Sequence, residues 1–185
     1  VFNSNSLNEK LADIQIDRAA GWKILDNQVY GGGFHCISVK KLARTVITGN
    51  HFDLDAVLAA NGDKPSAINI ASFSSQAINT ITNNVIFLDH DGASSGANPR
   101  AFLIESANNN ALVISNNPCF SNGTNDQAYE YTPATKMLNA TINNPLDASL
   151  TTGDKPSDIC DNWANNEVGV FTPIASFSTI GDFLP

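Results

Sequence analysis

Apolar and polar residues alternate along this chain in short stretches that share one pattern. In each copy an apolar residue precedes two mostly small or polar residues, an asparagine, any residue and a second apolar residue. Four copies have this pattern, at 24–29, 47–52, 81–86 and 114–119, and an imperfect fifth spans 142–146. The four asparagines, Asn27, Asn50, Asn84 and Asn117, are separated by 23, 34 and 33 residues. Self-similarity at such a period indicates a repeat architecture.

A second short stretch of alternating residues precedes each copy, at 14–16, 36–39, 68–70 and 102–104. Both stretches have the period of two that is typical of strands, and helical periodicity is almost absent. The exception is the segment 54–60, which could form one or two helical turns. A β-sandwich is the alternative, but the two-residue hairpin turns that it needs do not join matched stretches.

We therefore predict an all-β chain that winds into a right-handed parallel β-helix, a single-stranded solenoid. Each strand would pair with its counterpart one coil away, about 4.8 Å along the axis. The repeated asparagines would stack at the bend into a hydrogen-bonded ladder. The two longer spacings place insertion loops at 56–66 and 91–100, on one face of the solenoid. The coils should span 1–128, and 129–185 should form an irregular C-terminal cap or oligomerisation segment, because the pattern fades there.

Charge and composition narrow the possible partners. The 185 residues have a formal net charge of −8 and a pI near 4.6, which opposes nucleic-acid binding and anionic membranes at long range. No apolar run is long enough to span a membrane, so no membrane insertion is expected. The three cysteines, Cys36, Cys119 and Cys160, lie far apart and are odd in number, which favours buried, inert thiols over disulfides.

The residues of the first coils resemble a known family. The segments 12–24, 27–31 and 48–52 look like coils of phage tailspike depolymerases, which are trimeric right-handed parallel β-helices of the pectate-lyase-like class. The resemblance covers about residues 10–120 and includes no catalytic signature that matches residue by residue. It implies a homotrimeric virion protein that holds bacterial surface polysaccharide, commonly with glycosidase or lyase activity.

Candidate catalytic residues follow from the register of the repeat. Asp55 and Asp89 each lie five positions after a repeated asparagine, so on neighbouring coils they would stand roughly 5 Å apart. That is the separation that a retaining glycosidase uses, and repulsion at this distance raises one pKa. The alternative is that both are solvated loop acids.

The segment 89–92 is the densest polar cluster. Asp91 within it is a third catalytic candidate, and His90 is a ligand-binding one. The segment could also supply oxygen ligands to Ca²⁺, but four residues without further spaced acids are a weak metal signal, and an Asx-rich turn is the simpler interpretation. We therefore predict no metal and no cofactor.

Candidate sugar-binding residues lie near the coil bends. Alternation points His51 outward, next to Asp53, whereas His35 is a second histidine near a bend. Tyr30, at a strand end, and Trp163, in a polar loop, are the preferred aromatic platforms. Trp22 should instead pack in the core, because it lies two positions before Ile24.

Three functions fit this sequence. The first is a fragment of a phage-type tailspike that binds, and cleaves if the acids are catalytic, bacterial surface polysaccharide during host attachment. The second is a non-catalytic trimerisation segment of a virion fibre, and the third is a secreted β-helix polysaccharide lyase. The expected location is the virion or the extracellular space.

Overall fold

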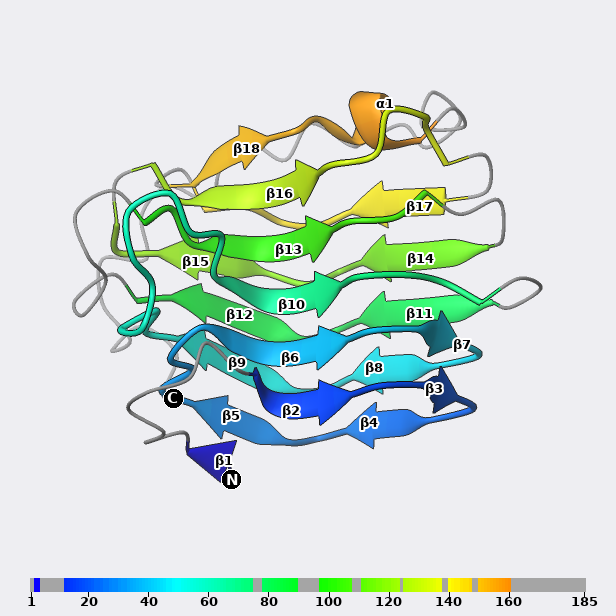
Figure 1. Cartoon of the computed structure of the whole chain (residues 1–185), viewed down its shortest axis with the longest axis horizontal. Helices are drawn as coiled ribbons and strands as arrows, with labels where there is room; N and C mark the ends of the chain where they lie inside the picture. The colour runs from blue at the N-terminus through cyan, green and yellow to red at the C-terminus, as the bar shows by residue number, and fades with distance from the viewer. Residues whose placement is uncertain are drawn as a thin grey trace, which may run out of the picture.

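The chain winds into an all-β parallel solenoid with almost no helix (Figure 1). The computed structural model describes residues 2–3, 12–74, 78–89, 97–107, 111–123, 125–137, 140–147 and 150–160. Every strand pair in this part of the chain is parallel. The predicted fold class is therefore confirmed, and the β-sandwich alternative, which needs antiparallel pairs, is wrong.

Four sheets run along the axis. Sheet A consists of β1 (Phe2–Asn3), β5 (Gln28–Tyr30), β9 (His51–Leu54), β12 (Val85–Leu88) and β15 (Cys119–Ser121). Sheet B, in front in Figure 1, consists of β2 (Ala12–Ile16), β6 (His35–Val39), β10 (Ser66–Ile70), β13 (Arg100–Ile104), β16 (Gln127–Tyr131) and β18 (Thr151–Gly153). Sheet C is the short pair β3 (Ala19–Ala20) and β7 (Leu42–Ala43). Sheet D consists of β4 (Lys23–Leu25), β8 (Val46–Thr48), β11 (Asn79–Thr82), β14 (Leu112–Ser115) and β17 (Ala140–Asn143). One coil runs from sheet B to sheet D to sheet A.

Each sheet turns one set of alternate side chains into the core. In sheet D the inward positions form a column of isoleucines in register, namely Ile24, Ile47, Ile81, Ile114 and Ile142. Sheet B contributes Ile37, Ile68, Phe102 and Tyr129, and sheet A contributes Val29, Phe52, Ile86 and Cys119. Stacking like residues on successive coils fills the interior without a helix, because each coil repeats the shape of the one before it.

The repeated asparagines form the predicted ladder at the bend between sheets D and A. The side-chain Nδ2 of Asn27 donates to Oδ1 of Asn50 (3.1 Å), and Asn50 donates in the same way to Asn84 (2.9 Å). Asn84 then donates to Asn117 (2.8 Å), and Asn117 donates to Asn144 (2.8 Å). The imperfect fifth copy of the pattern therefore belongs to the ladder.

The residue before each of the first four ladder asparagines makes the bend. It has a left-handed backbone in every case: Asp26 (φ 55°), Gly49 (φ 71°), Asn83 (φ 57°) and Asn116 (φ 56°). Asn, Asp and Gly tolerate this conformation better than other residues. The repeat therefore has a small or polar residue before each of these asparagines because the backbone is left-handed there.

Two local predictions were wrong. Segment 54–60 forms no helix, because the backbone N–H groups of Ala56 and Leu58 donate to the carbonyls of Gly32 and Gly33 on the preceding coil (both 2.9 Å). Trp22 is 52% exposed rather than in the core. It precedes β4 at a corner where Gly21 has a left-handed backbone (φ 71°), so the alternation of β4 does not extend back to it.

The first longer loop lies where the sequence placed it, because residues 55–65 join β9 in sheet A to β10 in sheet B. Most of the second predicted loop, 91–100, lies outside the described residues. The parallel sheets continue past residue 128 through β16, β17 and β18, and one helical turn, α1 (Pro156–Ile159), follows. Residues 161–185 lie outside the described residues, so a cap or oligomerisation role for 129–185 stays a prediction. No helix in the described ranges has the length and apolar character that a membrane span requires.

Candidate functional site

The outer face of sheet A holds most of the predicted site residues that the structure describes. In β9, Phe52 and Leu54 are buried in the core, so alternation turns His51 and Asp53 outward. His51 is exposed and Asp53 is half-buried. Tyr30 is 52% exposed at the end of β5. It follows Val29, which pairs with Phe52, so Tyr30 stands beside Asp53 on the neighbouring coil.

Two aromatic residues that the sequence analysis missed extend this column. Asp53 pairs in register with Phe87, and Phe87 pairs with Phe120. Both phenylalanines are half-buried outward positions: Phe87 lies between the core residues Ile86 and Leu88, and Phe120 follows the core residue Cys119. The column therefore runs Tyr30, Asp53, Phe87 and Phe120 along the solenoid axis, one residue per coil. Period-two alternation, if extended to the residues after each repeated asparagine, predicts this column.

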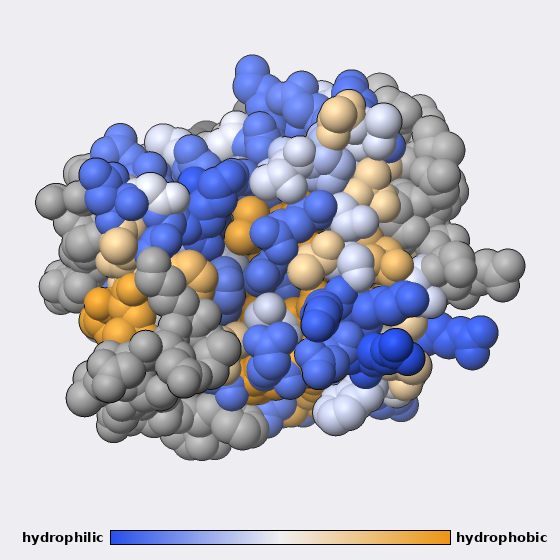
Figure 2. Space-filling model, viewed as in Figure 1, coloured by the Kyte–Doolittle hydropathy of each residue, from blue (hydrophilic) through white to orange (hydrophobic). Residues whose placement is uncertain are grey.

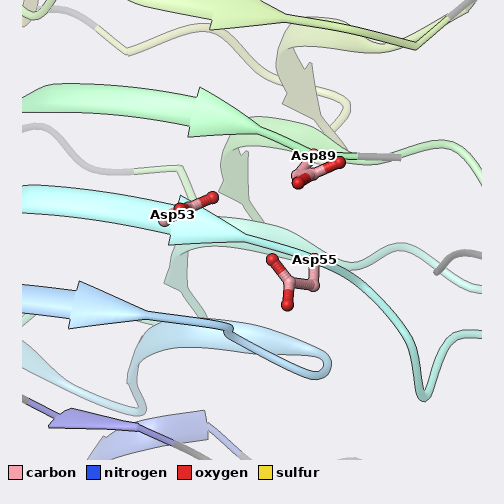
Figure 3. A group of neighbouring side chains, drawn as sticks. All are labelled: Asp53, Asp55 and Asp89. Carbon is pink, nitrogen blue, oxygen red and sulfur yellow. The ribbon is translucent and has the colours of Figure 1, made fainter. Parts of the chain in front are cut away.

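A second column, two positions further along the chain, contains the predicted acid pair. Asp89 follows β12, and its backbone N–H donates to the carbonyl of Leu54 (2.9 Å), which places it level with Asp55. The carboxylates of Asp53, Asp55 and Asp89 lie together, with one oxygen of each within 4.8 Å of the others (Figure 3). The predicted proximity of Asp55 and Asp89 is thus confirmed. Asp53 lies with them because its side chain points outward from β9, two positions before Asp55.

Asn122 completes the acidic column. Its side-chain Nδ2 donates to Oδ1 of Asp89 (2.7 Å), and its backbone N–H donates to the carbonyl of Leu88 (3.2 Å). Asn122 lies five positions after Asn117. The offset that identified Asp55 and Asp89 therefore also identifies Asn122, as a residue that orients the Asp89 carboxylate.

Burial and charge act together on Asp53. Burial raises the pKa of its carboxyl, and repulsion from Asp89 raises it further, whereas the neighbouring His51 opposes the shift. A carboxyl with a raised pKa next to a second acid is the arrangement that supplies a proton donor and a carboxylate in one site. The close approach of the oxygens fits the short separation of retaining glycosidases rather than the 6.5–9.5 Å of inverting ones. The same three oxygens could be part of a Ca²⁺ shell, which takes six to eight oxygen ligands.

Cys36 lies close to the acids but cannot act as a nucleophile. It is fully buried, and its Sγ donates to the backbone carbonyl of Asp53 (3.5 Å). Burial raises the pKa of the Cys36 thiol well above its usual value, and the nearby carboxylates of Asp13, Asp53 and Asp55 raise it further. The thiol therefore stays protonated. All three cysteines are free and buried, as predicted.

The other predicted residues do not join this face within the described ranges. His90, Asp91 and Trp163 lie outside the described residues. His35 is buried at the start of β6, where its Nδ1 contacts the Ser66 hydroxyl (2.8 Å) and its ring meets Phe34 edge to face. It is a core histidine and offers nothing to a ligand on sheet A.

Comparisons with protein-family models, with curated proteins and with solved structures found no match to this chain. The fold and the site geometry are therefore the basis of the functional argument.

Proposed function

We propose that this chain binds a bacterial surface polysaccharide along the outer face of sheet A, as the coils of a phage-type tailspike do. The column of Tyr30, Asp53, Phe87 and Phe120 carries the proposal. Aromatic faces pack against the apolar faces of sugar rings, and carboxylates and amides accept and donate hydrogen bonds to hydroxyls. One such residue per coil gives a linear track suited to a linear polymer.

The charge of this face favours neutral sugar units. The described strands of sheet A contain no Lys or Arg, and three carboxylates gather at its edge. Uronic acids, sialic acids or phosphates placed here would meet like charge without a compensating cation. A neutral, hydroxyl-rich repeat would instead find acceptors on Asp55, Asp89 and Asn122.

Cleavage is the second part of the proposal. Asp53, with its raised pKa, would donate the proton to the leaving oxygen, and Asp89, oriented by Asn122, would act as the opposing carboxylate. Asp55 stands one coil from Asp89 and would share the negative charge of the site. This assignment predicts retention of configuration at the anomeric carbon.

The test of binding uses purified neutral O-antigens and acidic capsular polysaccharides of known repeat in affinity electrophoresis. We expect retardation by a neutral polymer, weakened roughly tenfold by Tyr30→Ala or Phe87→Ala because each removes one stacking platform. Thr80→Ala, on the outer face of sheet D, is the matched control and should bind normally. Binding that persists in both folded aromatic variants would place the ligand elsewhere.

The test of cleavage measures new reducing ends on any polymer that binds. Asp53→Asn, Asp55→Asn and Asp89→Asn are compared with Asn122→Asp, which keeps the size of the side chain but removes the amide donor to Asp89. We expect Asp53→Asn and Asp89→Asn to abolish cleavage without abolishing binding. Unchanged cleavage in Asp53→Asn and Asp89→Asn alike would exclude this acid cluster as the catalytic site.

A further inference from the structure

We propose that the corner around sheet C is a second binding surface, which takes an acidic polysaccharide. Five exposed cations gather there on the first two coils: Arg18, Lys23, Lys40, Lys41 and Arg44. They are half of the ten basic residues of a chain whose net charge is −8. Strongly hydrophilic side chains accordingly cover the right-hand side of the molecule over β3 and β7 (Figures 1 and 2). This surface is distinct from the acidic face of sheet A and does not depend on the function proposed for that face.

The strand register stacks two of these cations, Arg18 and Lys41, on neighbouring coils. Ala19 and Ala20 in β3 pair with Leu42 and Ala43 in β7. Arg18 therefore stands level with Lys41, one coil or about 4.8 Å away along the axis. Like charges directly opposite each other destabilise a sheet, so this stacking is not explained by stability of the fold.

Acidic residues offset the charge of this corner only in part. Asp17 is the one acid in the segments 17–23 and 40–45, and the register places it level with Lys40. The two ion pairs found in the described part of the chain use other cations, Lys64 and Arg100, both with Glu130. A ligand would therefore meet exposed cations that no carboxylate of the described chain engages.

The backbone of Arg44 has a conformation that costs free energy for any residue with a Cβ. Arg44 has a left-handed backbone (φ 51°), and the equivalent position of the preceding coil is Gly21 (φ 71°), whose N–H donates to the carbonyl of Ala43 (2.9 Å). A residue with a Cβ is disfavoured in this conformation. The corner therefore holds an arginine where the preceding coil has a glycine, at a cost in backbone free energy.

Exposed apolar side chains next to the cations indicate which class of anionic ligand this corner would bind. Trp22 is 52% exposed beside Lys23, and Ile78 is 67% exposed at the same corner two coils further along. An indole face next to ammonium and guanidinium groups suits a sugar ring that carries a carboxylate or sulfate. A nucleic acid has a much denser charge, which the acidic remainder of the protein would repel.

The experiment compares three polymers in affinity electrophoresis: polygalacturonate as the acidic glycan, dextran as the neutral glycan and an oligothymidylate as the nucleic acid. We expect polygalacturonate to bind, with an affinity that falls as salt rises, and dextran not to compete with it. The double variant Lys40→Gln/Lys41→Gln should weaken binding roughly two- to fivefold for each lysine removed. The matched double variant Lys136→Gln/Lys155→Gln, which changes net charge equally at the other end of the solenoid, should bind as the wild type does.

Arg44→Gly separates a ligand-binding role from a structural one. This variant relieves the left-handed strain and removes one cation, so we expect stability that is unchanged or higher together with weaker binding of polygalacturonate. Equal loss of binding in both double variants would mean that net charge, not this corner, governs the interaction. Tighter binding of oligothymidylate than of polygalacturonate would also overturn the proposal, in favour of a nucleic-acid surface. Because Tyr30→Ala leaves this corner intact, its effect on neutral glycan tests the sheet A site alone.

Discussion

Removing one amide from the middle of the asparagine ladder should destabilise the protein far more than removing one from its end. Asn84 is fully buried and takes part in four side-chain hydrogen bonds. It accepts from N (3.0 Å) and Nδ2 (2.9 Å) of Asn50, and it donates to the carbonyl of Ile47 (3.0 Å) and to Oδ1 of Asn117 (2.8 Å). Asn84→Ala leaves the Asn50 backbone N–H and the Ile47 carbonyl without these partners. At about 1–3 kcal/mol for each of these two buried groups, the loss should be about 2–6 kcal/mol.

The control is Asn27→Ala at the N-terminal end of the ladder. Asn27 is half-buried, and Oδ1 of Asn50 keeps its bond from the Asn27 backbone N–H (2.9 Å) when the side chain is removed. We expect a loss of about 1 kcal/mol, because no buried group is orphaned. Urea denaturation followed by circular dichroism gives both values, provided that the slope with denaturant is the same for each variant. If the two substitutions cost the same, the ladder does not act as a buried network and our account of the bend is wrong.

Four further predictions concern single positions. Burial lowers the pKa of His35 to about 4, so the wild type should lose stability as pH falls from about 6.5 to 4, and His35→Gln should flatten that part of the pH–stability curve. Burial raises the pKa of Asp53, so the unfolded chain ionises first and the protein loses stability as pH rises above about 4. Asp53→Asn removes this loss and should therefore raise the urea midpoint at pH 7 but not at pH 3. Ile81→Ala leaves a cavity in the inner isoleucine column and should cost about 2–5 kcal/mol of unfolding free energy. Gly49→Asn copies Asn83 on the next coil but brings a Cβ against Oδ1 of Asp26, so it should cost about 1 kcal/mol, whereas Gly49→Val should cost more because a β-branched residue is poorly tolerated at φ 71°.

The bend was the most predictable part of the fold. An asparagine amide can donate to one neighbouring coil while it accepts from another, so an asparagine at a fixed place in the repeat is a direct sequence signal of a stacked bend. The same register predicts that Asp55 and Asp89 lie together, as they do in the structure. It would also have placed Asn122, had the offset been applied after Asn117.

What escaped prediction depends on contacts between coils and on the geometry of the corners. The segment 54–60 has helical periodicity, but hydrogen bonds to Gly32 and Gly33 hold its first half against the preceding coil. The alternation that buries Ile24 says nothing of Trp22, because Gly21 redirects the backbone between sheets C and D. Sheet C itself, and the cations it brings together, could not be read from spacing because the pattern lacks a marker residue at that corner.

The solenoid separates the residues that specify its fold from those that we propose bind ligands. The isoleucine column and the asparagine ladder face inward, whereas the aromatic column of sheet A and the cations of sheet C project outward from the same coils. Outward substitutions away from bends usually change stability little, so Phe87→Ala and Lys41→Gln should each remain folded and lose different ligands. Each variant is then the control for the other: Phe87→Ala should retain acidic glycan and Lys41→Gln should retain neutral glycan. Loss of both ligands in either folded variant would show that the two surfaces belong to one site, which their positions on opposite sides of the coil argue against.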